Sequence, residues 1–150
     1  YEITLLGSGV MQMKGPGFVP YEMKTNIIKI TGYRDKNPQG TLENPYFGGE
    51  VEFKSLMELL ILIEDMQDNL NFPQQSMEKR KFQDGIKADG KNLKLKEPPK
   101  EVLASFKLNI YFRQNASWQG NIIWLETQQE AQFRSVLEMI FIIDGALLNK

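Results

Sequence analysis

An internal repeat constrains the fold of this chain more than any other feature of its sequence. Residues 53–64 lie over residues 133–144 when the chain is compared with itself at an ungapped offset of 80 positions, and most of the apolar positions are kept. Upstream, Gln39-Gly40 meets a second Gln-Gly pair at the same offset. Two unrelated amphipathic helices would share apolar positions but not this turn. The pattern therefore predicts a tandem duplication, with residues 26–70 repeated at 105–150.

Each repeat begins with the period-two alternation of a half-buried strand. Ile28 and Ile30 alternate with Lys29 and Thr31, and the second repeat keeps the same alternation 80 residues later. Turn residues then separate this strand from two shorter ones. The expected strands are 28–33, 40–44 and 50–53 in the first repeat, and 108–113, 120–126 and 130–133 in the second.

A helix start follows the third strand in both repeats. Ser55 and Ser135 each stand three residues before a glutamate, Glu58 or Glu138, at the beginning of an apolar run. This is the capping box, in which the serine and the glutamate satisfy free backbone amides of the first helical turn. We expect helices over 55–70 and 135–148.

Both expected helices are apolar on more than one side. A helix that is apolar nearly all round is buried on both sides. We therefore expect each helix to pack on its own sheet and on the other helix, about a pseudo-two-fold axis.

The fold class that follows is α+β, with two β-β-β-α units whose antiparallel meanders each end in a helix. Residues 1–70 hold an N-terminal extension and the first unit, 71–104 form a polar linker, and 105–150 form the second unit. We expect one compact, pseudo-dimeric domain. A further strand over residues 1–6 could add to the first sheet.

Composition removes several classes of chemistry. The chain has no cysteine and no histidine, so it can build neither a disulfide nor a zinc–thiolate site nor a Ser-His-Asp triad. The 18 Lys and Arg residues nearly cancel the 19 Asp and Glu residues, whereas nucleic-acid-binding proteins usually carry a basic excess. No cofactor is expected.

The location of the protein is inferred from the absence of transport signals. No apolar run reaches the roughly 20 residues that a transmembrane helix needs, so no membrane association is expected. Nothing points to export, and we expect a cytoplasmic protein. The sequence opens on Tyr1 rather than Met, which leaves open the earlier removal of a signal peptide.

Three acids near the end of the first helix are the weak candidates for a metal site. Glu64 and Asp68 are one helical turn apart and could share a cation, with Asp65 beside them. They lack basic neighbours in the sequence. A solvated polar stripe is the alternative reading, and we favour it because the second repeat keeps only Asp144 there.

Candidate binding residues lie in the second repeat. Trp118 is expected at a hairpin tip, where the first repeat has a proline, and either contacts a partner or packs over the sheet edge. Strand parity places Lys107, Tyr111 and Arg113 on the sheet face away from the helices. Such a face could stack the bases of single-stranded nucleic acid or dock a protein.

Two resemblances concern the fold more than the chemistry. Residues 112–120 followed by 133–138 resemble small bacterial proteins that have no established function, and the first repeat through residue 80 resembles a companion group. A meander-plus-helix unit used twice is similar to the helix-paired dimers of single-strand-DNA-binding transcription coactivators. No functional residue is carried over from either resemblance.

The leading hypothesis is a non-enzymatic binding or interaction module that contacts a protein partner through a sheet face or the Trp118 hairpin. One alternative is a single-stranded nucleic-acid-binding protein that uses Lys107, Tyr111, Arg113 and Trp118. Another is a carboxylate-based, metal-dependent enzyme. The oligomeric state expected is a monomer completed by internal duplication, or a homodimer.

Overall fold

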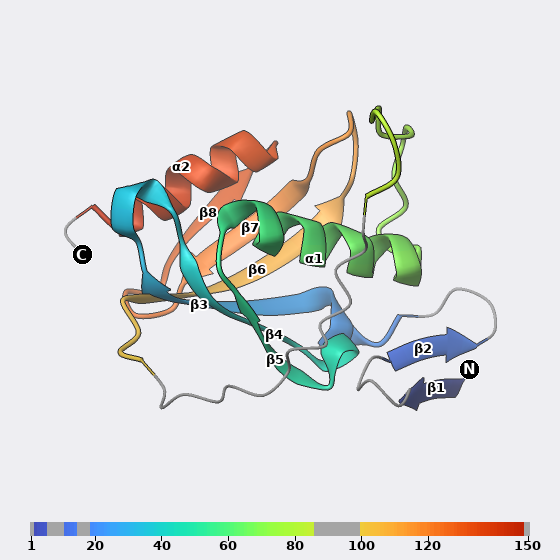
Figure 1. Cartoon of the computed structure of the whole chain (residues 1–150), viewed down its shortest axis with the longest axis horizontal. Helices are drawn as coiled ribbons and strands as arrows, with labels where there is room; N and C mark the ends of the chain where they lie inside the picture. The colour runs from blue at the N-terminus through green and yellow to red at the C-terminus, as the bar shows by residue number, and fades with distance from the viewer. Residues whose placement is uncertain (1, 6–10, 15–18, 86–99, 149–150) are drawn as a thin grey trace.

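The computed structural model describes residues 2–5, 11–14, 19–85 and 100–148. It is an α+β fold in which two helices lie on one face of a six-stranded antiparallel sheet, in the order β5-β4-β3-β6-β7-β8 (Figure 1). The elements of the first half are β3 (Thr25–Gly32), β4 (Gln39–Asn44), β5 (Gly49–Phe53) and α1 (Leu56–Leu70). Those of the second half are β6 (Ala104–Phe112), β7 (Gln119–Trp124), β8 (Gln129–Phe133) and α2 (Val136–Ala146). The α+β class and the order of these elements are confirmed.

The two halves share one sheet because β3 and β6 pair with each other. Their antiparallel register runs from Thr25 against Asn109 to Ile30 against Ala104, with Ile27 opposite Lys107. Each strand also pairs with the next strand of its own half. The two three-stranded meanders thus become one continuous sheet.

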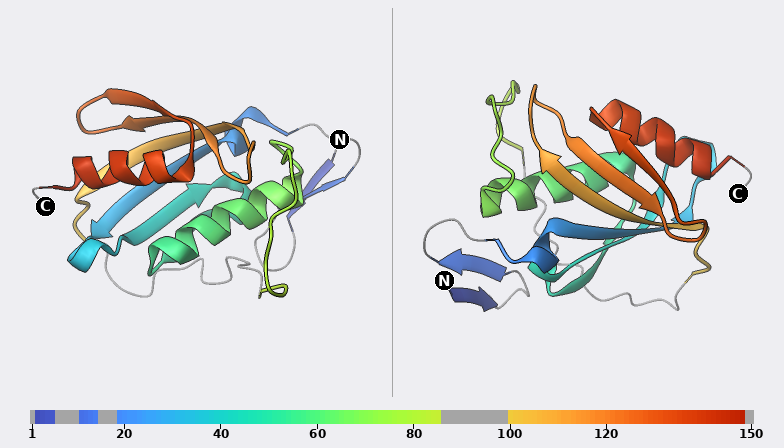
Figure 2. Two further views of the ribbon diagram at one scale, coloured as in Figure 1. Left: turned by 90° about the horizontal axis from the view of Figure 1, so that it is seen from above. Right: turned by 180° about the vertical axis from the view of Figure 1, so that it is seen from behind.

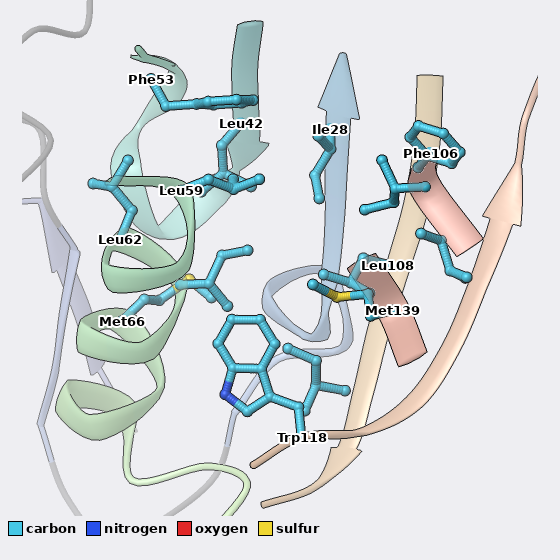
Figure 3. Packing of buried hydrophobic residues seen from close by; sticks show 14 of the residues in the cluster. Ile28, Leu42, Phe53, Leu59, Leu62, Met66, Phe106, Leu108, Trp118 and Met139 are labelled. Atoms are coloured by element: carbon cyan, nitrogen blue, oxygen red, sulfur yellow. The ribbon is translucent and has the colours of Figure 1, made fainter. Parts of the chain in front are cut away.

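The core lies between this sheet and the two helices. Alternate residues of β3 and β6 point toward the helices and are buried, as the alternation in the sequence predicts. Both helices cover the same face of the sheet (Figure 2). Figure 3 shows Leu59, Leu62 and Met66 of α1 facing the buried residues of the strands.

Both helices start at the predicted serines. The Oγ atoms of Ser55 and Ser135 accept hydrogen bonds from the backbone amides of Glu58 (3.1 Å) and Glu138 (3.2 Å). Each glutamate carboxylate reaches back to the amide of the residue before the serine, which is Lys54 or Arg134. These bonds satisfy amides that have no partner within the helix.

A bulge interrupts the first strand of each half at the same place in the 80-residue offset. The register moves from Ile30 opposite Gly40 to Gly32 opposite Gln39, and the second half repeats this between Ile110 and Phe112. The extra residue reverses the parity of everything that follows it. Phe112 is therefore exposed and Arg113 is buried, the reverse of the predicted alternation.

The prediction that both helices are buried on two sides is wrong for four large apolar side chains. Met57 and Ile61 of α1 are exposed, and so are Leu137 and Phe141 of α2. The sheet covers only the inner side of each helix, so the outward residues meet solvent rather than a second packed layer.

The N-terminal strand also differs from expectation. β1 (Glu2–Leu5) pairs with β2 (Met11–Lys14) in a separate two-stranded sheet rather than joining the main one. Short 3-10 helices follow at Tyr21–Lys24 (η1), Arg34–Lys36 (η2) and Pro45–Phe47 (η3). Of the linker expected over 71–104, residues 86–99 lie outside the described residues, and Ala104 already belongs to β6.

The two glycines beside the bulges should tolerate no side chain. A Cβ at Gly40 would lie 1.8 Å from the carbonyl oxygen of Lys29, and one at Gly120 would lie 1.9 Å from that of Asn109. We expect Gly40→Ala and Gly120→Ala each to lower the free energy of unfolding by about 3 kcal/mol, the upper part of the range for overpacking, as measured by urea denaturation.

Gly145→Ala is the matched control for these two variants. No atom lies within 4 Å of a Cβ at this helical position. Because alanine is the better helix former, stability should rise by up to about 1 kcal/mol. An equal loss in all three variants would contradict the close approach at the bulges.

Candidate functional site

The most strongly bonded polar cluster of the described chain is centred on Arg113. The bulge in β6 turns this residue toward α1, where its side chain is only 2% exposed. The guanidinium donates to Asp68 Oδ1 (2.6 Å), Glu64 Oε1 (3.1 Å) and the carbonyl oxygen of Pro73 (2.6 Å). Arg113 thus ties the second half of the sheet to the helix of the first half.

Two further donors complete this cluster. Lys79 lies 2.9 Å from Glu64 Oε2 and 3.1 Å from Asp68 Oδ2. The indole N–H of Trp118 donates to Glu64 Oε1 at 3.0 Å. Figure 3 shows the Trp118 ring inside the core, on the side where α1 carries Met66. The segment after α1 lies against the cluster, because the backbone of Gln75 forms a parallel β-bridge with that of Arg113.

The pKa values of the two acids follow from these bonds. Burial alone would raise the pKa of Glu64, but hydrogen bonds from Lys79, Trp118 and Arg113 outweigh it and lower the pKa from the usual 4.5. Burial likewise opposes ionisation of Asp68, and its bonds to Arg113 and Lys79 lower its pKa from 3.8. Both groups are therefore ionised at neutral pH and already neutralised by cations.

A smaller cluster occupies the matching place in the other half of the molecule. The Tyr33 hydroxyl donates to Asp144 Oδ1 at 2.8 Å, and the Lys36 ammonium lies 2.6 Å from the same oxygen. Burial and the bond to Asp144 raise the pKa of Tyr33 to about 12. Tyr33 and Asp144 stand 80 positions from Arg113 and Glu64, so each β-hairpin contacts the helix of the other half.

The sheet face away from the helices is largely polar and bonded to itself. Lys107, Asn109 and Tyr111 point to this face, as predicted. The side-chain oxygen of Asn121 accepts from Asn109 and from Tyr111, both at 3.0 Å, and its amide donates to Glu130. Tyr111 is 52% exposed and offers an open aromatic group there.

A cavity of about 350 Å³ opens between α2 and strands β6 to β8. Trp124 forms one wall, and its indole nitrogen is buried without an acceptor among the residues that the structure describes. Gly145 and Ala146 of α2 leave the opposite side open, since neither has a large side chain. The remaining lining residues are Phe106, Ile122, Gln129, Glu130, Ala131 and Ile142.

The corresponding place in the first half is filled by the chain itself. Tyr46 and Phe47 of η3 are buried and meet edge to face, with ring centroids 5.0 Å apart. The Tyr46 hydroxyl accepts a hydrogen bond from Asn69 of α1 at 2.7 Å. At an offset of 80, Glu126 and Thr127 stand where the two aromatic residues are, and both are exposed.

The outward sides of the two helices carry the four exposed apolar residues named above, which we call the helix stripe. Met57 and Ile61 are one helical turn apart, and Leu137 and Phe141 hold the same positions 80 residues later. Leu137 is 63% exposed and Phe141 68%. Neither helix contains Lys or Arg, so the charged residues that the two helices place beside the helix stripe are acids.

The predicted site residues are thus divided between different surroundings. Lys107 and Tyr111 lie on the outer sheet face, whereas Arg113 is buried, so the prediction that Arg113 lies on that face is wrong. Trp118 is buried as well, which favours the packing alternative over an open hairpin tip. Of the metal candidates, Glu64 and Asp68 have the basic partners that the sequence did not reveal. Within 2–5, 11–14, 19–85 and 100–148, no three His, Cys, Asp or Glu side chains gather as a metal site would require.

Sequence reasoning missed both the helix stripe and the cavity. The stripe had a signal in the outward apolar positions of the helices, which we assigned to burial. The cavity had a weaker one, the replacement of an aromatic pair by Glu126 and Thr127.

In comparisons with models of known protein families, with curated proteins and with solved structures, no match to this chain was found. Among the residues with described structure, no helix is long and apolar enough to cross a membrane.

Replacing Arg113 should destabilise the protein strongly. Arg113→Met keeps an apolar stem but leaves Lys79 as the one cation of this cluster that still pairs with Glu64 and Asp68. We expect a loss of about 3 kcal/mol in the free energy of unfolding, the low end of the range for breaking a buried ion pair, because the acids keep one cation. Arg134→Ala removes a solvent-exposed ion pair and should have no measurable effect in the same urea titration.

The effect of Arg113→Met should depend on pH. The folded-state pKa values of Glu64 and Asp68 lie below 4.5 and 3.8, so their ion pairs stabilise the protein above these values and lose that effect as the acids protonate. The difference in stability between wild type and variant should be largest near neutral pH and shrink as the pH falls below about 4. A difference that stays constant down to pH 2.5 would exclude the ion pairs as its source.

Proposed function

We propose that this protein is a non-enzymatic interaction module that docks a protein partner on the helix stripe. The observation that carries the proposal is the exposure of four large apolar side chains at matching positions of α1 and α2. Clustered exposed apolar side chains are typical of interaction surfaces, because leaving them in water is unfavourable. An amphipathic partner segment is a common way to cover such a surface.

The charges around the helix stripe suggest the chemistry of the partner. Both helices carry acids and no base, with Glu58 and Glu138 in the first turns. Arg134 already pairs with Glu138, and cations of other segments pair with Glu64, Asp68 and Asp144, which leaves Glu58 as the first-turn acid beside the stripe. A partner with an apolar face bordered by Lys or Arg would complement the stripe and this acid. We therefore propose a basic, apolar segment of another protein as the occupant.

The outer sheet face supports an interaction less well. Its central polar side chains bond to one another, as Asn121 does with three neighbours. Binding of single-stranded nucleic acid there would also lack two of its four expected contacts, since Arg113 and Trp118 are buried. Lys107 and Tyr111 remain on that face.

We also propose that the fold arose by tandem duplication, with a pseudo-two-fold axis near the pair formed by Ile27 and Lys107. The two bulges, the two serine caps and the reciprocal hairpin–helix contacts all recur at an offset of 80. Both turns also place two successive non-glycine residues at positive φ, Asp35-Lys36 and Asn115-Ala116. Clearly unequal costs of Gly40→Ala and Gly120→Ala would count against equivalence of the halves.

Site-specific photo-crosslinking can test where the partner binds. A benzophenone amino acid placed at Phe141 in cells should give a defined adduct, and the added change Leu137→Asp should remove it. The mapped segment of the adduct should contain apolar residues with Lys or Arg nearby. The same photo-reactive residue at Lys107, on the opposite face, is the matched control.

The outcomes of this crosslinking separate the surfaces. Adducts from position 107 alone would move the interaction to the outer sheet face, and adducts from neither position would reject the proposal. An adduct with a second copy of the chain would identify a homodimer and reject a different protein as the occupant.

A further inference from the structure

The two halves of the molecule differ in the residues near the C-terminal end of the helix. These belong to the turn between β4 and β5 in the first half and to the turn between β7 and β8 in the second. In the first half, η3 inserts Tyr46 and Phe47, and the second of these is only 1% exposed. In the second half, the same positions are Glu126 and Thr127, and the space beside Trp124 is the cavity described above.

The helices differ in the same way, since α2 has smaller side chains than α1 at the two positions that line the cavity. The lining residues Gly145 and Ala146 of α2 correspond to Asp65 and Met66 of α1. Met66 is buried in the core of the first half, whereas no atom lies within 4 Å of a Cβ built at Gly145. Both changes remove volume, whereas Phe106 and Trp124 on the strands are larger than Asn26 and Asn44, their counterparts at the offset of 80.

We propose that the cavity beside Trp124 is a receptor for one aromatic side chain, Tyr or Phe, presented by the protein partner. The inference rests on the proposed function and names the anchor of that partner. The structural argument is that the first half fills this place with an aromatic pair from its own turn, whereas the second half supplies none.

The composition of the cavity suits such an occupant. Phe106, Ile122 and Ile142 provide apolar contacts, and Trp124 provides an aromatic wall for an offset or edge-to-face contact. Gln129, which lies opposite Trp124 on the helix side of the sheet, is a hydrogen-bonding group suited to a tyrosine hydroxyl. Its volume of about 350 Å³, at the low end of the roughly 300–1,000 Å³ of ligand pockets, has room for an aromatic side chain.

An aromatic anchor would add binding free energy to contacts made on the helix stripe. Aromatic residues that enter preformed pockets contribute a large share of the binding free energy in protein complexes. The helix stripe would then supply the surrounding apolar contact. A partner could use both surfaces of α2, which carries Phe141 on its outward side and Ala146 at the cavity.

The probe for the test is a peptide with the sequence of residues 44–49, Asn-Pro-Tyr-Phe-Gly-Gly, which fills the equivalent place in the first half. Its binding can be followed by NMR through the indole N–H of Trp124 and the methyl groups of Ile122 and Ile142. We expect saturable shifts of these signals with millimolar affinity. The same peptide with alanine in place of Tyr and Phe is the control ligand and should give none.

Two variants of the full chain close the cavity from different sides. Ala146→Met introduces the residue that the first half has at this position, and Thr127→Phe introduces the aromatic residue of the turn at an exposed position. Each should weaken peptide binding at least tenfold. Leu137→Asp, which changes only the helix stripe, should leave peptide binding unchanged.

Several results would overturn the inference. These are the absence of shifts, shifts that persist unchanged in a folded Thr127→Phe variant, and binding of p-cresol without binding of the peptide, which would make the cavity a small-molecule site. Failure of the peptide together with a crosslink from Phe141 would reject the anchor and leave the proposed function standing. Peptide binding without that crosslink would support the aromatic anchor and reject the helix stripe as the docking surface.

Discussion

The pairing of β3 with β6 is the contact on which the rest of the structure depends. It joins strands whose paired residues are about 80 positions apart in the chain, and it turns two three-stranded meanders into one six-stranded sheet. A three-stranded meander with one helix offers little buried surface by itself. The shared sheet places both helices on one face and so gives the molecule a common core, in which Phe106 and Leu108 of β6 lie beside Ile28 of β3.

The bulges determine how the two halves contact each other beyond the sheet. One extra residue in β6 turns Arg113 inward, where it meets Glu64 and Asp68 of the opposite half. The equivalent bulge in β3 brings Tyr33 to Asp144. A guanidinium that is almost fully buried requires charged partners. The contact of Arg113 with Glu64 and Asp68 therefore also keeps both carboxyl groups ionised. They are structural ion pairs, which explains why the acids near the end of α1 are poor candidates for chemistry.

The halves are alike in their backbone and different in the surfaces that remain available. Each half carries the same pair of outward apolar positions, so both halves contribute to the helix stripe. The cavity beside Trp124 lies in the second half, whereas in the first half the aromatic residues Tyr46 and Phe47 are buried at the positions that correspond to Glu126 and Thr127. Two halves of similar backbone thus provide the scaffold, and the local differences at Glu126, Thr127 and Ala146 distinguish the half that we propose to bind.

The sequence by itself determined the order of the strands and helices, the starts of both helices and the parity of β3 and β6 up to their bulges. These features arise from residues close together in the chain, such as Ser55 with Glu58, or the alternation around Ile28 and Ile30. Tertiary structure decided the inward turn of Arg113, the burial of Trp118, the exposure of the helix stripe and the presence of the cavity. Each of these depends on contacts between distant segments; Trp118 and Arg113 meet Glu64 across 54 and 49 residues. The sequence shows that such side chains are apolar or charged, but only the packing of the sheet and helices decides which of them face water.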